Sequence, residues 1–530
     1  MDSIKLLARN GDAVRQALEL GEILHIDTAS EELTDEFLLF AIKSGLLDQW
    51  AAAFPDPRQW SETSMKVIIA ASLAARFAGL YSLRKTGYVL RSARVLGELG
   101  YAVEVLEEGC GLSSRGTADD SVISGDSLRK LLVKMEALVK VPPAAAAAVT
   151  AVAHAELPAP VKVRARLSRR SVKQVVDEGA AEARAQAVAT QLVSWYNQAG
   201  MGMLEYARLG RGRRLHILDA TPIEVALATV TYECSGVVKN DDGSHSRGYK
   251  LATLRTLLDT AGLLTQVAMG PIQQHDLELC RELLWTSAAL RRGDLVIEDR
   301  GFLDGQTLGH LKGERGVDVI IPLKSNMHAY SEAVSLAEME RQWEPHPSRR
   351  DQQIAFVREV DHVWDECQVA LNACVIRFYN RRKRATDYIV LVTTDLKLSA
   401  QWMVRHYEER PEIEQDYQQL KSGGWHLQKL SSTRYTEIVW YVLTVVLSYN
   451  LYQLFANTQA GSRFASKTRQ AIALEQIKTH RTHVIVYAGG YFEIFETLTF
   501  VRLVLQLSLE VQTRLRKWLD EHLDSVKMQE

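Results

Sequence analysis

Three acidic residues of this 530-residue chain, Asp219, Asp299 and Glu414, have positions suited to a shared metal site. Asp219 and Asp299 each end a short apolar run, and Glu414 lies beside the apolar stripe of a predicted helix. Three converging carboxylates repel one another and raise one another's pKa, and divalent cations remove that conflict. An all-oxygen ligand set suits Mg²⁺, and Mn²⁺ can substitute for it. Two such ions would activate a nucleophilic oxygen and stabilise the leaving oxygen of a phosphodiester.

The segment that carries Glu414 is "YEERPEIEQDYQQLK", residues 407–421. Pro411 suits the first turn of a helix, and the next Gly or Pro is Gly423. These signals predict a helix from about Pro411 to Lys421.

If that helix also takes in Tyr407–Arg410, one stripe about 60° wide holds Tyr407, Arg410, Glu414 and Lys421. Taken alone, the segment could be an amphipathic helix with charged boundary residues. Together with the two aspartates, it instead predicts Arg410 and Lys421 as phosphate ligands and Tyr407 as a contact to nearby DNA. A helical wheel of the segment places Ile413, Tyr417 and Leu420 in the neighbouring apolar stripe. The far side of the helix holds Glu408, Glu412, Asp416 and Gln419.

The elements around these residues read as β, β, β, α, β, α, β between residues 215 and 325, which predicts a mixed α/β layer with helices on its faces. Two of the runs are joined by "DTAG" (259–262), whose composition is typical of a β-hairpin turn. Residues 326–395 contain two further strand-like runs joined by the basic turn "NRRKRAT" (380–386). A catalytic centre at the edge of a sheet would be positioned by this arrangement.

In content and order, these motifs resemble those of the DDE transposases of bacterial insertion sequences that carry a Tyr-x2-Arg-x3-Glu-x6-Lys signature. "LDAT" (218–221) resembles the first-Asp motif of that group, and "EDRGF" (298–302) resembles the second. The resemblance runs from about Leu215 to Phe455. It implies an RNase H-like core with a mostly β insertion placed before the helix of the catalytic glutamate.

The resemblance also implies an activity: metal-dependent cutting at transposon ends and joining of the freed 3′-OH to target DNA. Asp219, Asp299 and Glu414 would bind the metals, and the other signature residues would contact DNA near the scissile phosphate. Double-stranded DNA, as terminal inverted repeats and target, is the implied partner, held by a homodimer because two ends must be joined. Two alternatives stay open: a domesticated descendant that binds DNA without cutting it, and a metal-dependent nuclease without strand joining. Some relatives form a DNA hairpin and place a tryptophan beside a flipped base; Trp343 and Trp364 lie in the corresponding region and could equally belong to the core.

Further basic residues are candidates for contacts to the DNA backbone, whose strength would fall steeply with salt. These candidates are Arg300 beside Asp299, Arg213 and Arg214 before the first strand, and Arg381, Arg382 and Lys383 at the predicted hairpin tip. The hairpin cluster fits a solvated turn equally well.

The whole chain is predicted to have six parts, with an α/β core between helical ends. They are a helical N-terminal region (1–140) with a role in DNA-end binding or dimerisation, an Ala/Pro linker and basic helical segment (141–207), the first part of the core (208–325), the β-rich insertion (326–395), the second part of the core (396–456) and a helical C-terminal region (457–530). The formal net charge is −2, but residues 1–60 carry 11 acidic and 5 basic side chains, and residues 161–214 carry 11 basic and 4 acidic ones. Such a local basic excess is what a phosphate-backbone contact needs.

Five widely spaced cysteines without a CxxC pair indicate reduced thiols. The N-terminus lacks the apolar core of a signal peptide. The apolar run Ile438–Ala456 contains Ser448, Asn450 and Gln453, which favours a buried core helix over a membrane span. We therefore expect a bacterial cytoplasmic, nucleoid-associated protein without a membrane partner.

Overall fold

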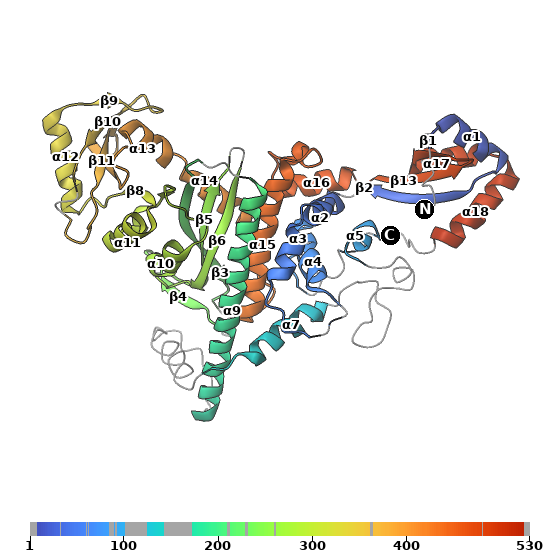
Figure 1. Cartoon of the computed structure of the whole chain (residues 1–530), viewed down its shortest axis with the longest axis horizontal. Helices are drawn as coiled ribbons and strands as arrows, with labels where there is room; N and C mark the ends of the chain where they lie inside the picture. Colours follow the sequence, from blue (N-terminus) through green and yellow to red (C-terminus); the bar gives the residue numbers. More distant parts are fainter. Residues whose placement is uncertain are drawn as a thin grey trace. The chain divides into compact units, whose positions relative to one another are not determined.

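The computed structural model describes residues 8–31, 33–59, 61, 63–83, 90, 93–100, 125–141, 172–208, 212–227, 232–258, 261–360, 364–479 and 481–523. The chain forms two compact units (Figure 1). Unit 1 comprises residues 1–40, 91–122 and 470–530, and unit 2 comprises residues 41–90 and 123–469. Residues 142–171 of the predicted linker and basic segment lie outside the described residues, as do residues 209–211.

Unit 2 contains a mixed ten-stranded sheet, which confirms the α/β prediction. Its strands are, in spatial order, β4 (Gly236–Lys239), β5 (His245–Leu257), β3 (Leu215–Val225), β7 (Leu295–Ile297), β8 (Asp318–Pro322), β12 (Ala385–Thr393), β11 (Asn372–Asn380), β10 (Gln352–Val357) and β9 (Glu344–Pro345), with β6 (Gly262–Pro271) also paired to β5. The pairs β3–β7 and β7–β8 are parallel, and the other pairs are antiparallel. The central strand β7 is buried along its length, as a strand covered on both faces must be. This mixed arrangement is consistent with an RNase H-like DDE domain.

The predicted insertion is not a separate sheet. Residues 326–395 supply helix α12 (His328–Glu340) and strands β9 to β12, and β12 pairs with β8 of the core through Leu391–Thr393. The insertion therefore extends the core sheet and ends directly before helix α13 (Ala400–Tyr407). Met403 and Val404 of α13 pack against β10, β11 and β12, so the chain enters the signature segment from a fixed position.

Long helices pack against the opposite end of the core sheet. Helices α9 (Val172–Tyr206) and α15 (Tyr435–Ala456) contact β6 and each other, and they lie side by side in Figure 1. In the described part of the chain, α15 is long and apolar enough to cross a membrane, yet 94% of its apolar window is buried in the protein. One polar residue of this helix, Asn450, has partners on the sheet, because its side chain hydrogen-bonds both the N–H and the C=O of Leu264 on β6. The prediction of a core helix is confirmed.

Further, shorter helices and turns lie between residues 33 and 479. They are helices α2 (Leu33–Lys43), α3 (Leu46–Ala53), α4 (Met65–Phe77), α7 (Gly125–Leu138), α10 (Asp276–Thr286), α11 (Gly305–His310), α14 (Pro411–Ser422) and α16 (Arg469–Thr479), with short turns Arg300–Phe302, Leu311–Arg315 and Ser462–Phe464. Helix α7 packs against α9 and α15.

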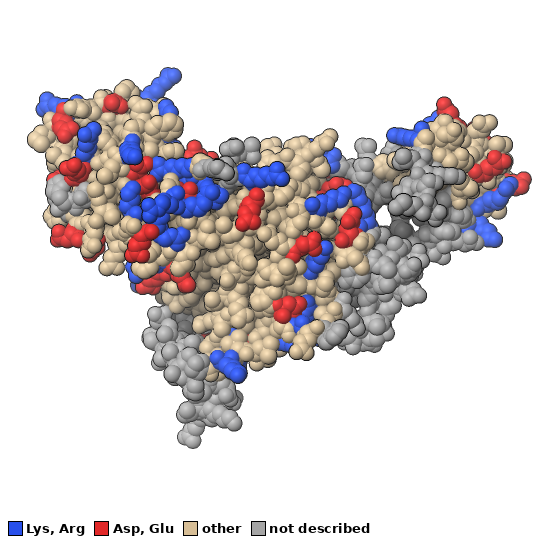
Figure 2. Space-filling view, viewed as in Figure 1, with Lys and Arg blue, Asp and Glu red and all other residues tan. Residues whose placement is uncertain are grey.

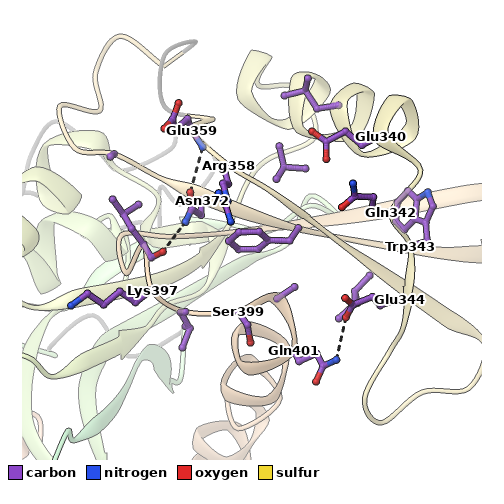
Figure 3. Close-up of a pocket in the computed structure, with 18 residues that line it drawn as sticks. Glu340, Gln342, Trp343, Glu344, Arg358, Glu359, Asn372, Lys397, Ser399 and Gln401 are labelled. Atoms are coloured by element: carbon purple, nitrogen blue, oxygen red, sulfur yellow. Dashed lines mark hydrogen bonds between the residues drawn. The ribbon is translucent and has the colours of Figure 1, made fainter.

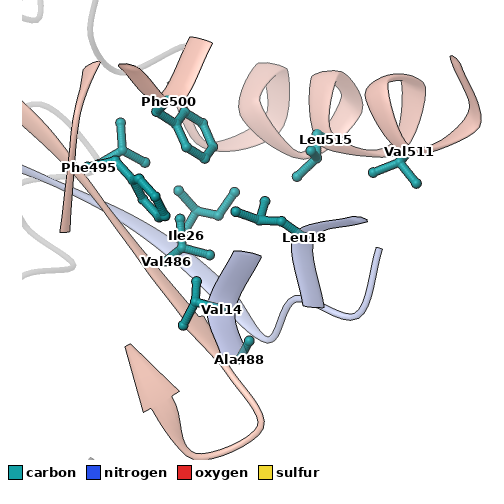
Figure 4. Packing of buried hydrophobic residues seen from close by; sticks show 10 residues of the cluster. Val14, Leu18, Ile26, Val486, Ala488, Phe495, Phe500, Val511 and Leu515 are labelled. Carbon is teal, nitrogen blue, oxygen red and sulfur yellow. The ribbon is translucent and has the colours of Figure 1, made fainter. Parts of the chain in front are cut away.

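Unit 1 differs from the helical ends expected from the sequence, because it contains a four-stranded sheet in the order β1-β14-β13-β2. Its strands are β1 (Ala8–Arg9), β2 (His25–Glu31), β13 (Arg481–Ala488) and β14 (Tyr491–Glu496), and its helices are α1 (Gly11–Leu20), α5 (Ala93–Glu98), α17 (Thr497–Gln506) and α18 (Leu509–Leu523). In the stretch "THVIVYAGGYFEIFE", strand-forming residues alternate in character on both sides of Gly489–Gly490, and the stretch forms a hairpin. The sequence interpretation missed this hairpin pattern. Figure 4 shows its core, in which Val14 and Leu18 of α1 face Val486, Phe495 and Phe500.

Candidate active site

The first aspartate, Asp219, lies within a strand and not at its end, which corrects the prediction. Strand β3 continues to Val225 because β5 pairs with it along that whole length. On its other side, pairing with β7 stops at Ile217–Ile297, two residues before Asp219. Asp299 follows the end of β7 at the same edge and caps the short turn Arg300–Phe302. Both carboxylates therefore emerge where the parallel ladder ends.

The signature segment forms two helices and not one. Helix α13 ends at Tyr407, and α14 begins at Pro411, which occupies the first turn as predicted. Tyr407 therefore belongs to a different helix from Glu414, so the continuous wheel considered above is wrong at its N-terminal end. Arg410 stands at the start of α14 with helical backbone angles, and this preserves the i,i+4 relation between Arg410 and Glu414.

The guanidinium of Arg410 lies between all three predicted carboxylates. Its Nη1 donates a hydrogen bond to Glu414 Oε1 at 2.7 Å. Its Nη2 is 3.4 Å from Asp299 Oδ2 and 4.0 Å from Asp219 Oδ2. The elements β3, β7 and α14 thus bring the three carboxylates to one place.

The two aspartates are oriented in the same way by the backbone that follows them. Asp219 Oδ1 accepts a hydrogen bond from the N–H of Ala220, and Asp299 Oδ1 accepts one from the N–H of Arg300, both at 2.8 Å. In each case Oδ2 is the oxygen that faces Arg410. One oxygen of each carboxylate is fixed, and the other is directed to the centre of the site.

The charges of the site need a cationic partner. Burial, with repulsion from Asp299 and Glu414, raises the pKa of Asp219 to about 6, although the Ala220 N–H and Arg410 oppose the shift. Burial lowers the pKa of Arg410, but attraction to Asp299 and Asp219 outweighs burial and raises it overall. Asp219 therefore needs positive charge nearby to ionise fully near neutral pH.

The donor chemistry fits Mg²⁺ or Mn²⁺, because the three groups supply carboxylate oxygens alone. In the described part of the chain, however, no three His, Cys, Asp or Glu side chains stand close enough to hold a metal ion as a group. The carboxylates of Asp219, Asp299 and Glu414 are spread around Arg410 instead. Metal binding at these oxygens therefore requires Arg410 to move away and the carboxylates to close in.

The other two signature residues border this centre. Burial lowers the pKa of Lys421, and attraction to Glu224 and Asp219 opposes that shift. Burial raises the pKa of Tyr407, whose ring packs beside the apolar cluster of α13 and β10 to β12.

The remaining basic candidates fall into two groups. Arg300, Arg381 and Arg382 are exposed, and the latter two lie in the turn between β11 and β12, where a hairpin tip was predicted. In the second group, Arg213 bonds Asp395 at 2.5 Å and Asp318 at 3.1 Å, and Lys383 bonds Asp387 at 2.7 Å. For Arg214, the bond to Asp294 comes from the backbone N–H and not from the guanidinium. Figure 2 shows Lys and Arg side chains gathered, among some acidic ones, around α14 and the adjoining insertion.

Residues of α14 that the sequence interpretation did not single out hold this helix in place. Tyr417 and Asp416 are both buried, although the wheel placed Asp416 on the far side. Asp416 accepts hydrogen bonds from Arg255 of β5 and from Tyr449 of α15, both at 2.7 Å. A helical wheel could not predict these two hydrogen bonds, because Arg255 and Tyr449 lie 161 and 33 residues from Asp416 in sequence.

Glu298, the residue before Asp299, is a second unexpected group. It is fully buried, and neither of its carboxylate oxygens has a hydrogen-bond partner among the described residues. Burial, with repulsion from Asp304, raises its pKa to about 8. Glu298 is therefore protonated at neutral pH.

A large cleft lies in the insertion and contains one of the two tryptophans noted above. It has a volume of about 1410 Å³ and lies between α12, β9, β10 and the start of α13. Figure 3 shows Trp343 at its border with Gln342, Glu344 and Gln401. One face of the Trp343 ring is covered by Arg377, whose guanidinium carbon is 3.9 Å from the ring centroid. Trp364 is partly buried outside the residues that line this cleft.

Comparison with known families agrees with this geometry. Residues 210–451 match the family model of the transposase DDE domain. The matched range includes β3, β7 and α14, which carry the three carboxylates. No curated protein matches the chain. The match supports a DDE transposase, a class of nucleotidyl-transfer enzymes that bind DNA.

Proposed function

We propose that the protein is a DNA transposase that cuts at transposon ends and transfers the freed 3′-OH to target DNA. The convergence of Asp219, Asp299 and Glu414 on one cationic group carries this proposal, because a phosphodiester-transfer site needs the same oxygens for metal ions. The Tyr-Arg-Glu-Lys signature and the mixed sheet favour the insertion-sequence group with an RNase H-like core.

Each side chain has a defined task in this proposal. Asp219, Asp299 and Glu414 would hold two Mg²⁺ ions, and Mn²⁺ can take their place. When bound, the ions supply activation of the attacking oxygen and neutralisation of the leaving oxygen. The backbone N–H groups of Ala220 and Arg300 orient the aspartates before any ion arrives.

The basic side chains around the carboxylates would hold DNA. Arg410 carries a planar guanidinium suited to bidentate contact with a phosphate, and Lys421 lies on the same helix toward Asp219. The exposed Arg300, Arg381 and Arg382 extend the set of possible backbone contacts. Arg213 and Lys383 would have to leave their carboxylate partners before they could contact DNA. We infer a homodimer on two inverted repeats, acting in the bacterial cytoplasm at the nucleoid.

The test is a cleavage and strand-transfer assay with the full chain. The substrate carries terminal inverted repeats as candidate transposon ends, and the reaction contains Mg²⁺ and a supercoiled target plasmid. We expect wild-type protein to cut at the repeat ends and to join them to the plasmid. Glu414→Gln should bind the same DNA and reduce cleavage by at least about 100-fold, since it removes a metal ligand while keeping the shape of the side chain.

The outcomes separate the three candidate activities. Cleavage without joining would identify a nuclease. DNA binding without cleavage would identify a domesticated DNA-binding protein. Cleavage by Glu414→Gln at the wild-type rate would show that Glu414 is not a metal ligand.

A further inference from the structure

The phenol of Tyr417 connects the helix of Glu414 directly to the backbone of Asp219. Its hydroxyl lies 2.8 Å from the carbonyl oxygen of Asp219 and 2.8 Å from Thr253 Oγ1. A carbonyl oxygen can only accept, so Tyr417 donates its proton to Asp219, and the Thr253 hydroxyl donates to Tyr417. Thr253 is the register partner of Asp219 on β5. The chain of donors therefore runs from β5 through α14 to β3.

These hydrogen bonds are shielded from water. Tyr417 is 6% exposed and Thr253 is 0% exposed. The acceptor lies at the point where β3 has lost β7 as its partner, so Tyr417 supplies a donor beyond the end of the parallel ladder. An unpaired buried carbonyl there would be unfavourable, which keeps the phenol in place.

Tyr417 also has a fixed relation to the candidate metal ligand on its own helix. It follows Glu414 by three residues, and residues at this spacing are neighbours on a helix surface. The adjacent Asp416 fixes the same turn of α14 to Arg255 of β5 and Tyr449 of α15. The helix can therefore neither slide nor rotate without breaking contacts to β3, β5 and α15.

From this geometry we propose that Tyr417 and Thr253 are positioning residues that set the separation between the carboxylates of Glu414 and Asp219. The inference rests on the proposed function, because that separation matters when both carboxylates bind metal. Catalytic constellations must be held within about 0.5 Å of the productive geometry, which is a tighter requirement than folding imposes. Loss of the phenol hydroxyl should thus affect metal binding more than the stability of the fold.

The experiment compares Tyr417→Phe and Thr253→Val with a control, Tyr196→Phe, in the full chain. Tyr196 is also fully buried, donates to a strand carbonyl (Leu264, 2.5 Å) and accepts from another side chain (Asn450, 2.9 Å), but it does so at β6. Two quantities are measured for each protein: Mn²⁺ affinity without DNA, by calorimetry, and the Mg²⁺ concentration that gives half-maximal cleavage. Thermal unfolding reports the structural effect of each substitution.

We expect Tyr417→Phe to weaken Mn²⁺ binding and to raise the half-maximal Mg²⁺ concentration by about tenfold, the usual size for groups that orient metal ligands. At saturating Mg²⁺ the cleavage rate should return to within about threefold of wild type, because every ligand is still present. Thr253→Val should act in the same direction with a smaller shift. Tyr196→Phe should lower the unfolding temperature as much as Tyr417→Phe and leave both metal measurements unchanged.

Equal metal affinity in wild type and Tyr417→Phe would overturn the inference, and so would an equal shift in Tyr196→Phe. If Tyr417→Phe does not fold, Thr253→Val decides in the same way. If wild type binds Mn²⁺ and cuts no DNA, the proposed function fails, while the calorimetric comparison still judges the positioning role.

Discussion

Replacing Arg410 with glutamine should have opposite effects on metal binding and on DNA cleavage. In the structure, its guanidinium faces three carboxylates, at 2.7 Å (Glu414), 3.4 Å (Asp299) and 4.0 Å (Asp219). These oxygens are also the predicted metal ligands. In wild type, a divalent cation must therefore displace Arg410 before it can bind, and in Arg410→Gln it meets three carboxylates without a competing charge.

The size of the effect follows from the distances and the exposure of the groups. Two unit charges 4 Å apart interact by about 1 kcal/mol in water and about 4 kcal/mol near a protein surface. The Arg410 side chain is 17% exposed, but those of Asp299 and Glu414 are 36% and 55% exposed, so the lower part of that range applies. Part of the loss is recovered because the displaced guanidinium is hydrated. We expect a net gain of about 1.4 kcal/mol, which is tenfold tighter metal binding in Arg410→Gln.

Bound DNA should change the metal affinity of wild type relative to that of Arg410→Gln. If Arg410 moves to a DNA phosphate, it no longer competes for the carboxylates, so DNA should tighten metal binding to wild type. By linkage, metal must then tighten DNA binding by the same factor. In Arg410→Gln the coupling should be lost, and cleavage should be slower because the phosphate contact is gone.

Calorimetric titration with Mn²⁺ at pH 8 measures the effect without turnover and with Asp219 ionised, since burial raises its pKa to about 6. The control is Arg213→Gln, which removes the same charge from between two other carboxylates, those of Asp395 and Asp318. That variant should retain wild-type affinity. Unchanged or weaker Mn²⁺ binding by DNA-free Arg410→Gln would refute the competition between Arg410 and metal.

Two further outcomes concern buried charge near the site. Because the pKa of Glu298 is raised to about 8, the folded protein keeps a proton that the unfolded chain loses near its ordinary pKa of 4.5, and stability falls as the pH rises between these values. Glu298→Gln should remove this fall in stability with pH. Between pH 5 and pH 8.5, denaturant titrations should therefore show the free energy of unfolding of the variant rising relative to that of wild type by on the order of 4 kcal/mol. Parallel pH profiles of the two proteins would contradict a raised pKa for Glu298. Asp416→Asn should lower the free energy of unfolding by about 3–5 kcal/mol, because Arg255 is left buried without its buried countercharge. Glu412→Gln removes a 42% exposed partner of the same arginine and should lower it by at most about 1 kcal/mol, and equal losses would argue against a buried pair.

The elements that carry the candidate site could be predicted from the sequence because local signals define them. Short apolar runs indicated the strands, and Pro411 indicated the start of α14. The carboxylates followed because Asp219 and Asp299 stand at the point where two parallel strands stop pairing. Such features depend on residues within a few positions of each other.

What the sequence could not predict depends on distant partners. The anchoring of α13 requires Met403 and Val404 to pack on the insertion sheet, whereas the break before α14 falls where Pro411 has no N–H to donate to the carbonyl of Tyr407. The burial of Asp416 requires Arg255, which lies 161 residues earlier. The sheet of unit 1 pairs β1 and β2 with β14 and β13 from the other end of the chain, although the β13–β14 hairpin itself carried a local signal.

The spacing of the signature has a structural reason that extends beyond the four residues that define it. Within two turns, α14 holds Glu414 toward Arg410, Asp416 toward Arg255, and Tyr417 toward the backbone of Asp219. A shift of the helix by one residue would rotate these side chains by about 100° and break all three contacts together. The helix therefore has one register in which its structural bonds form, and in that register Glu414 faces the two aspartates. Because Arg410 lies between them, the fold can hold the three carboxylates around one cationic group before a metal ion arrives.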